Sequence, residues 1–302
     1  MQRLSFVFLF VGILLGGFAA SQILHFHPLA LASVITSTQE DYVESDALLR
    51  EHFREQGSFP KKEERGNRSV TATSTGAIKI PVMVYHSVRA HVSGESAIQD
   101  QYDITPELLE SELVYLKEHG YTTIQFAQVI GYFDHDTPLP EKPVILSFDD
   151  GWENQYTHAF PLLKKYGMTG TFFIYTNPID HQKKHWMTWK QVVALDQAGM
   201  EVAGHSRTHP MLTKITTDQG LDKEILGSKQ ILEQHLGHTI TVFAYPFGMR
   251  DARVITAVKR AGYLLARTTH AGVWNNEEYR YEFTGQLSTD NIADFERLLK
   301  LK

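Results

Sequence analysis

The feature that most constrains this chain is an apolar run that ends abruptly in two adjacent carboxylates and a glycine. Residues 144–148 read Val-Ile-Leu-Ser-Phe, and Asp149, Asp150 and Gly151 follow directly. Such a run is typical of a buried strand, and α/β folds place their chemistry at the carboxyl ends of such strands. A simple turn would also explain Asp-Asp-Gly taken alone. Two neighbouring carboxylates repel each other, so a partly buried pair needs a cation or a proton nearby.

Candidate partners for these carboxylates follow a second short apolar stretch. Residues 200–203 lead into His205 and His209, which point the same way if the chain turns helically after a strand. Two imidazoles and one carboxylate can hold a divalent metal on one face and leave a position open for water. A single histidine is more often structural than ligating, and this chain has 15 of them. The two motifs taken together nevertheless indicate a metal site rather than a turn.

Length and composition are those of a globular protein with a sizeable core. The chain has 302 residues, 42% of them hydrophobic, which allows one large domain with additional segments. The formal net charge of −6 and the lack of a long basic run in the body argue against nucleic acid as a partner. There is no cysteine, which excludes disulfides and thiolate ligands but does not identify a cellular compartment.

The amino-terminal part predicts a targeting segment followed by a spacer. A basic terminus precedes an apolar stretch over residues 4–20, so we expect residues 1–32 to be an export signal. The signal is either cleaved, which gives a secreted protein, or kept as a membrane anchor with the catalytic body outside the membrane. A buried helix of a soluble protein is the alternative. Residues 33–79 are polar and linker-like, and we expect them to tether a catalytic domain at residues 80–302.

Strands and helices are expected to alternate through that domain. The expected strands cover residues 80–86, 121–124, 144–148, 169–175, 200–203, 242–245 and 263–267. The expected helices cover residues 105–120, 126–133, 156–166, 189–198, 217–236, 252–261 and 292–301. Six or seven such units in roughly 220 residues fit a parallel α/β barrel better than an open sheet, because no phosphate-binding glycine loop follows the first strand.

Three motifs in order carry a resemblance to a known family. Residues 147–151 (Ser-Phe-Asp-Asp-Gly), 205–209 (His-Ser-x-x-His) and 244–248 (Ala-Tyr-Pro-Phe-Gly) resemble those of the polysaccharide deacetylases, the NodB-homology or carbohydrate esterase family 4 enzymes. The resemblance covers residues of roughly 80–301. Residues 81–88 resemble the opening strand of the poly-N-acetylglucosamine deacetylase branch. The family's fold, a distorted and incomplete (β/α)7 barrel with its site on the carboxyl face, is therefore expected here.

The resemblance also implies roles for the first two motifs. Asp150, His205 and His209 would hold one divalent metal ion, zinc by default, with cobalt or nickel as alternatives. Asp149 would be the general base for a water molecule that the metal activates.

The third motif and its surroundings are expected to contact substrate. Phe247 would offer its backbone N–H to the oxyanion, and Tyr245 would line the same site. Trp152 would pack beside the acetyl group, although an ordinary core tryptophan is an equal alternative.

The chain departs from the family pattern at two points, a buried ion pair and the general acid, and the ion pair is the first. Ala244 stands where many relatives have an arginine, and no Asp-x-Trp motif follows, so both members of an ion pair are missing from their usual places. Arg207 or Arg250 is a candidate to supply positive charge near Asp149. We interpret the joint absence as a divergent branch rather than a dead enzyme.

The general acid is the second departure, because no histidine follows Gln286. His270 is the first candidate to protonate the leaving amine, and His86 is the second. An ordinary surface role for either histidine is the alternative, and Asp149 could then return the proton itself.

These observations predict an extracytoplasmic, metal-dependent hydrolase that removes N-acetyl groups from an extracellular or wall polysaccharide. Poly-N-acetylglucosamine of biofilms is the first candidate substrate, with peptidoglycan, chitin and acetylxylan as alternatives. A catalytically silent glycan-binding protein on the same barrel is the rival hypothesis, and a non-carbohydrate amidase is a third.

Overall fold

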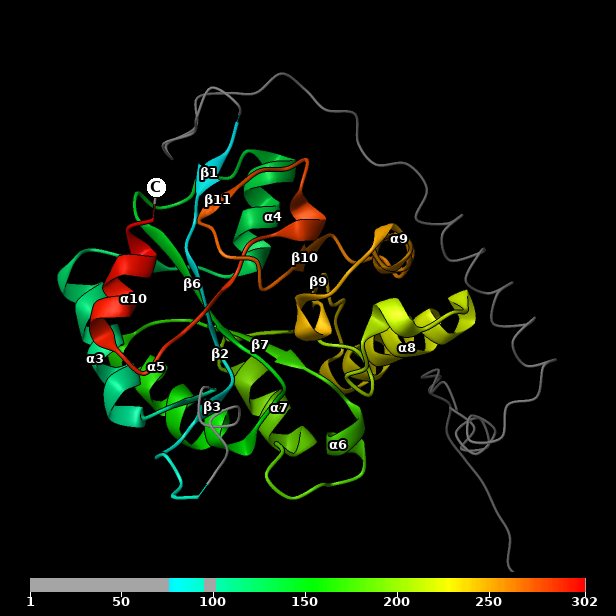
Figure 1. Cartoon of the computed structure of the whole chain (residues 1–302), viewed down its shortest axis with the longest axis horizontal. Helices are drawn as coiled ribbons and strands as arrows, with labels where there is room; N and C mark the ends of the chain where they lie inside the picture. The colour runs from blue at the N-terminus through cyan, green and yellow to red at the C-terminus, as the bar shows by residue number, and fades with distance from the viewer. Residues whose placement is uncertain (1–75, 95–101, 302) are drawn as a thin grey trace, which may run out of the picture. The chain divides into compact units, whose positions relative to one another are not determined.

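The computed structural model describes residues 76–94 and 102–301 (Figure 1). The predicted export signal at residues 1–32 and nearly all of the predicted linker lie outside the described residues, so these two assignments stay predictions. Within the described ranges, no helix is both long enough and apolar enough to cross a membrane.

A curled parallel sheet forms the centre of the described fold (Figure 1). Its strands follow the order β10–β9–β8–β7–β6–β2–β12, and every pairing along this path is parallel. The strands are β2 (Val82–Tyr85), β6 (Pro143–Phe148), β7 (Thr171–Ile174), β8 (Glu201–Gly204), β9 (Val242–Ala244), β10 (Leu265–Arg267) and β12 (Gln286–Leu287). This path confirms the predicted α/β barrel of distorted, incomplete form.

One chain segment links the two edges of this sheet. Phe283 forms a parallel bridge with Arg267 of β10, and β12, which follows shortly after, pairs with β2. Short strands complete the pairing: β1 (Ile78–Lys79) with β11 (Trp274–Asn275), β3 (Ser87–Val88) with β4 (Asp103–Ile104), and β5 (Thr122–Thr123) with β6. Parallel strands around a curled sheet bring their carboxyl ends to one edge.

Helices surround the sheet, and most lie where their capping residues predict them (Figure 1). The longer ones are α3 (Pro106–Glu118), α4 (Phe126–His135), α5 (Phe160–Tyr166), α7 (Trp189–Gln197), α8 (Asp218–Leu236), α9 (Ala252–Arg260) and α10 (Ile292–Leu299). Shorter turns are α6 (Asn177–Asp180) and the 3₁₀ segments η4 (Leu212–Lys214), η5 (Pro246–Gly248) and η6 (Arg280–Glu282). Thr105 and Thr217 each accept a backbone N–H at a helix start, as N-caps do.

The predicted helix at residues 156–166 is wrong in one respect. Its first part is a π-helical turn, η3 (Gln155–Ala159), and only α5 is regular. Single π turns occur often at functional sites. Here the turn holds the buried Gln155 side chain against the backbone carbonyls of His86 and Asp149.

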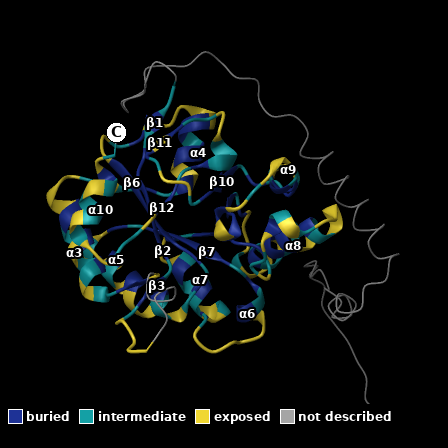
Figure 2. Cartoon of the chain, in the orientation of Figure 1, coloured by how far each residue is buried: buried dark blue, intermediate teal, exposed yellow. Residues whose placement is uncertain are grey.

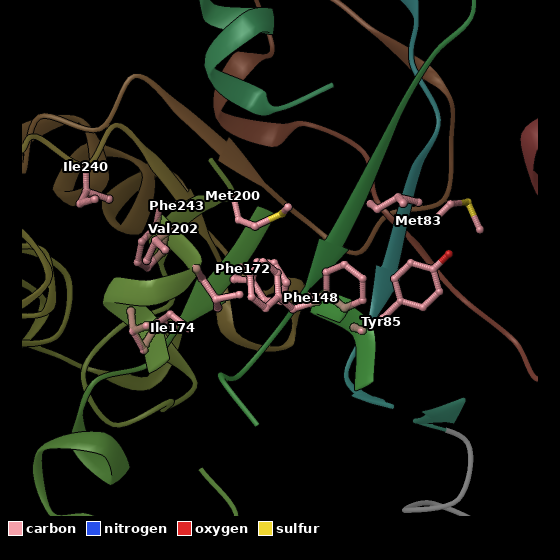
Figure 3. Packing of buried hydrophobic residues seen from close by; sticks show 14 of the residues in the cluster. Met83, Tyr85, Phe148, Phe172, Ile174, Met200, Val202, Ile240 and Phe243 are labelled. Carbon is pink, nitrogen blue, oxygen red and sulfur yellow. The ribbon is translucent and has the colours of Figure 1, made fainter. Parts of the chain in front are cut away.

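Alternate residues of the strands fill two separate apolar clusters. In β2, Met83 and Tyr85 belong to the cluster beneath the outer helices, while Val82 and Val84 belong to the other. This is the period of two expected for a sheet buried on both faces, and Figure 2 shows the central strands as buried. Tyr85, Phe148 and Phe172 stack across three adjacent strands, with ring centroids 5.0 and 4.9 Å apart (Figure 3). This stack holds the strand ends next to the site.

Candidate functional site

The polar residues singled out from the sequence gather at the carboxyl edge of the sheet. Asp149 and Asp150 follow β6, His205 follows β8, and His86 follows β2. The Asp149 N–H donates to the carbonyl of Tyr85 at 2.8 Å, so neighbouring strand ends are locked in register. Parallel pairing therefore brings together side chains from distant parts of the sequence.

Asp150, His205 and His209 form a cluster with metal-ligand geometry. Oδ1 of Asp150 lies 3.6 Å from Nε2 of His205 and 3.4 Å from Nε2 of His209. One ligand atom from each residue lies within 4.8 Å of the others. Ligands about 2.0–2.1 Å from a tetrahedral zinc ion stand about 3.3 Å apart, so the spacing suits such an ion.

The two carboxylate oxygens of Asp150 differ in their hydrogen bonding. Its Oδ2 accepts a hydrogen bond from Nε1 of Trp152 at 3.0 Å, whereas Oδ1 is buried and has no hydrogen-bond partner among the described residues. A buried acceptor without a partner is unfavourable. A cation between Oδ1 and the two imidazoles would satisfy it, so the residues present fit a divalent metal.

His205 is prepared for such a role by its surroundings. Its Nδ1 lies 2.8 Å from the carbonyl oxygen of Ala244. A carbonyl can only accept, so Nδ1 carries the proton and Nε2 presents its lone pair to Asp150. Burial lowers the pKa of His205 to about 4, which keeps the ring neutral near pH 7.

The backbone around this cluster adopts rarely populated conformations. Asp150, Ser206, His209 and Phe247 have φ values of 79°, 66°, 58° and 58°. Non-glycine residues seldom adopt positive φ, and such strain concentrates at functional sites. Gly248 has φ 66°, and a Cβ there would lie 2.2 Å from Oγ1 of Thr269, so only glycine fits.

Asp149 lies next to this cluster in a buried ion pair. Nη2 of Arg267 is 2.5 Å from both carboxylate oxygens, and neither side chain is more than 3% exposed. Burial alone would raise the pKa of Asp149, but Arg267, with His205 and His86, lowers it overall. Asp149 is therefore ionised at neutral pH.

Arg267 corrects the expectation that Arg207 or Arg250 supplies this positive charge. Arg250 instead pairs with Glu282 at 2.8 Å. Arg267 is the last residue of β10, close to the end of a strand that the sequence predicts. A basic residue at the carboxyl end of a barrel strand was the available signal.

His86 borders Asp149 on the side of β2. Its Nε2 lies 3.9 Å from Oδ2 of Asp149, and its ring packs against Tyr102, with centroids 4.8 Å apart. The side chain is 19% exposed and lines a small pocket together with Asp103 and Ser288.

His270 has different neighbours. Its ring nitrogens lie 3.0 and 3.2 Å from the guanidinium of Arg250, and its backbone N–H donates to Oγ1 of Thr268. Of the two histidines predicted as general acid, His86 is the one that contacts Asp149.

The three predicted substrate contacts are arranged differently. Trp152 stacks on Trp186, with centroids 4.3 Å apart, and Phe247 is 52% exposed and packs against His209 at 4.7 Å. Tyr245, in contrast, is 1% exposed, and its hydroxyl donates to the carbonyl of Tyr281 at 3.0 Å. Tyr245 is thus a core residue, and its side chain is removed from any surface that substrate could reach.

Comparisons with known proteins relate the chain to polysaccharide deacetylases. Residues 136–266 match the family model described as "Polysaccharide deacetylase". A putative polysaccharide deacetylase, YxkH of Bacillus subtilis, is 29% identical over 203 residues, which cover 67% of this chain and 69% of that protein. A poly-beta-1,6-N-acetyl-D-glucosamine N-deacetylase of Staphylococcus epidermidis is 27% identical over 198 residues, covering 59% and 68%. The structure of the Streptococcus pyogenes deacetylase PplD in complex with acetate shares the fold, with a TM-score of 0.69 at 24% identity over 74% of this chain and 99% of that chain.

Proposed function

Because the chain carries a NodB-type polysaccharide deacetylase domain, we propose that it removes N-acetyl groups from an extracytoplasmic glycan, with poly-β-1,6-N-acetylglucosamine as the first candidate. The observation that carries the chemistry is the unpartnered Oδ1 of Asp150, which faces the Nε2 atoms of His205 and His209 beside the ionised Asp149. The named substrate of the staphylococcal relative supports the choice of glycan.

Asp150, His205 and His209 would hold one divalent ion, with zinc as the first choice for two imidazoles and one carboxylate. Such an ion supplies Lewis acidity toward a water molecule and toward the amide carbonyl. The protein's part is to orient these ligands: Ala244 fixes the ring of His205, and Trp152 fixes the carboxylate of Asp150.

Asp149 would accept the proton of the attacking water on a carboxylate oxygen. Arg267 keeps this carboxylate ionised and holds it in place, so the base is ready without a prior proton loss. The backbone N–H of Phe247, in η5 beside His209, would donate to the developing oxyanion.

His86 would donate the proton that the leaving amine requires. Its Nε2 lies 3.9 Å from Oδ2 of Asp149, so a proton donor stands beside the proposed base. Trp152 and Phe247 would flank the acetylated sugar, since both lie next to metal-ligand candidates. Export by residues 1–32, with retention at the membrane, is part of the same proposal.

The test is acetate release by the purified full-length protein, loaded with zinc, from β-1,6-linked N-acetylglucosamine oligomers. Asp149→Asn should lower kcat by about 10²- to 10⁴-fold while glycan binding is retained. Asp134→Asn is the matched control, because Asp134 also forms a bidentate pair with an arginine, Arg280, but is partly exposed and separate from the site.

Other outcomes decide between the rival assignments. Binding of the glycan without metal-dependent acetate release would replace the enzyme with a silent glycan-binding protein. Higher kcat/KM on peptidoglycan, chitin oligomers or acetylxylan would keep the reaction and overturn the proposed substrate.

A further inference from the structure

The loop that carries His209 is held by a residue from a distant helix. Oε2 of Glu224 accepts the backbone N–H groups of Arg207 at 3.1 Å and of Thr208 at 2.8 Å. Its Oε1 accepts the hydroxyl of Thr208 at 2.7 Å. One carboxylate thus makes three hydrogen bonds to two residues that lie between the two histidines.

Glu224 is placed for this purpose on the buried face of α8, the long yellow helix of Figure 1. Leu221, Ile225 and Ser228 share that face at helical spacing, and Glu224 is 8% exposed. Burying a carboxylate is unfavourable unless hydrogen bonds satisfy it. The three hydrogen bonds accepted by the Glu224 side chain all come from the loop of residues 205–209, called the histidine loop below. The helix therefore uses this acid to bind the loop.

The loop needs such support because its backbone is strained. Ser206 and His209 have positive φ, and Oγ of Ser206 accepts the N–H of His209 at 3.0 Å. Strained non-glycine conformations persist only where surrounding contacts over-determine them. The Glu224 contacts fix Arg207 and Thr208, and so fix the chain between the two strained residues.

The two histidines are therefore held by different means. His205 directly follows β8 and is anchored to the carbonyl of Ala244 in the sheet. Within the described residues, the His209 ring contacts Asp150 and other aromatic rings but no sheet carbonyl, so its position depends on the loop. We propose that Glu224 is a positioning residue that sets His209 as the third metal ligand; this inference rests on the metal site proposed above.

The experiment measures metal affinity rather than turnover. Zinc dissociation constants of the metal-free full-length protein are obtained by competition with a chromophoric chelator, and cobalt loading reports coordination by its visible absorption. Glu224→Ala should raise the dissociation constant by about 10- to 100-fold, as loss of outer contacts to metal ligands does, and should weaken the four-coordinate cobalt bands.

Two further variants separate positioning from a general loss of structure. Glu224→Gln should restore most of the affinity, because an amide oxygen can accept the Arg207 and Thr208 N–H groups and the amide nitrogen can donate to the Thr208 hydroxyl. Glu233→Gln on the same helix is the matched control. Its carboxylate binds Lys229 and the N–H of Ile240 instead, so zinc affinity should match that of the wild type.

The outcomes are distinguishable from those of the proposed function. If the wild type binds no zinc, the metal site itself fails. If the wild type binds zinc and a folded Glu224→Ala protein binds it equally well, Glu224 is not a positioning residue. Should Glu224→Ala not fold, Thr208→Val removes one of the three hydrogen bonds, and wild-type affinity in that variant would overturn the inference.

Discussion

The buried acid Glu112 gives a sharp prediction about the pH dependence of stability. This residue of α3 is fully buried, and its Oε2 accepts a hydrogen bond from the hydroxyl of Tyr85 at 2.8 Å. Its Oε1 lies 3.3 Å from Oγ of Ser288. Burial raises the pKa of Glu112 from 4.5 to about 8, although both hydrogen bonds act in the opposite direction.

The sign of the effect follows from proton binding. Above pH 4.5 the carboxyl of the unfolded chain ionises, while the folded protein keeps Glu112 protonated up to about pH 8. The folded state therefore binds more protons in this window, and stability falls as pH rises. At about 1.36 kcal/mol per pH unit, the whole window amounts to about 5 kcal/mol, of which about 4 kcal/mol lies between pH 5 and 8.

Glu112→Gln removes this dependence, because glutamine has the shape of the protonated acid and cannot ionise. Its amide oxygen can accept from Tyr85, and its amide nitrogen can donate to Ser288. The free energy of unfolding of wild type minus variant should therefore fall by about 4 kcal/mol from pH 5 to pH 8. The depressed pKa of His205 gives the opposite slope, but it is present in both proteins and cancels in the difference.

Urea unfolding of the two proteins at several pH values measures this difference. Glu110→Gln on the same helix is the control, since the pKa of Glu110 is lowered by hydrogen bonds from Lys165 and Tyr166. Its difference curve should not fall across the window. Parallel stability curves for the wild type and Glu112→Gln would refute the reasoning. Glu112 would then be ionised in the folded protein, or the structure around it would be locally unfolded.

Four other variants test the site and its support. His86→Gln should lower kcat by about 10²-fold or more, whereas His270→Gln should leave it near wild type; the reverse order in steady-state assays would return His270 to the role of acid. Arg267→Met should destabilise the protein by about 3–5 kcal/mol in denaturant titrations, because the buried Asp149 carboxylate is left without its cation. Since Arg267 lowers the pKa of Asp149, the variant should also move the acid limb of the pH–rate profile to higher pH. An unmoved limb would argue against Asp149 as the base. Glu201→Ala should cost about 3 kcal/mol of stability with zinc affinity unchanged, because the loss leaves two N–H groups of α4 without their acceptor; a wild-type melting curve would contradict this.

The helices of this fold were predictable because their boundaries are local in sequence. Thr217 caps α8, and Gly237 ends it with a φ of 78°, a conformation that glycine adopts readily. Thr105 and Gly167 act likewise for α3 and α5. The π turn before α5 has no such signal, because it arises from contacts of Gln155 with two carbonyls on other segments.

The residues of the site likewise divide into those that lie in local sequence motifs and those that only the fold brings together. Asp150, His205 and His209 lie in short motifs, so their grouping followed from the sequence once parallel strands were assumed. The pairing of Asp149 with Arg267 joins positions 118 residues apart. The position of Arg267 at the end of a predicted strand is a local signal, but it does not tell which carboxylate the side chain reaches. The burial of Tyr245 could not be anticipated either, since its ring direction depends on how the chain leaves β9.

Five buried or partly buried acids in the described part of the fold show that the chemistry of a carboxylate is set by its partner. Glu201 satisfies N–H groups at the amino end of the barrel, and Glu224 does so for the histidine loop. Asp149 is neutralised by a buried guanidinium, and Glu112, with no cation, is neutralised by a proton. Of these five described acids, Asp150 alone keeps a buried oxygen with none of these partners, although two lone-pair nitrogens face it. A chain that satisfies four such groups and leaves the fifth open at the carboxyl edge of its strands is built to receive a cation there.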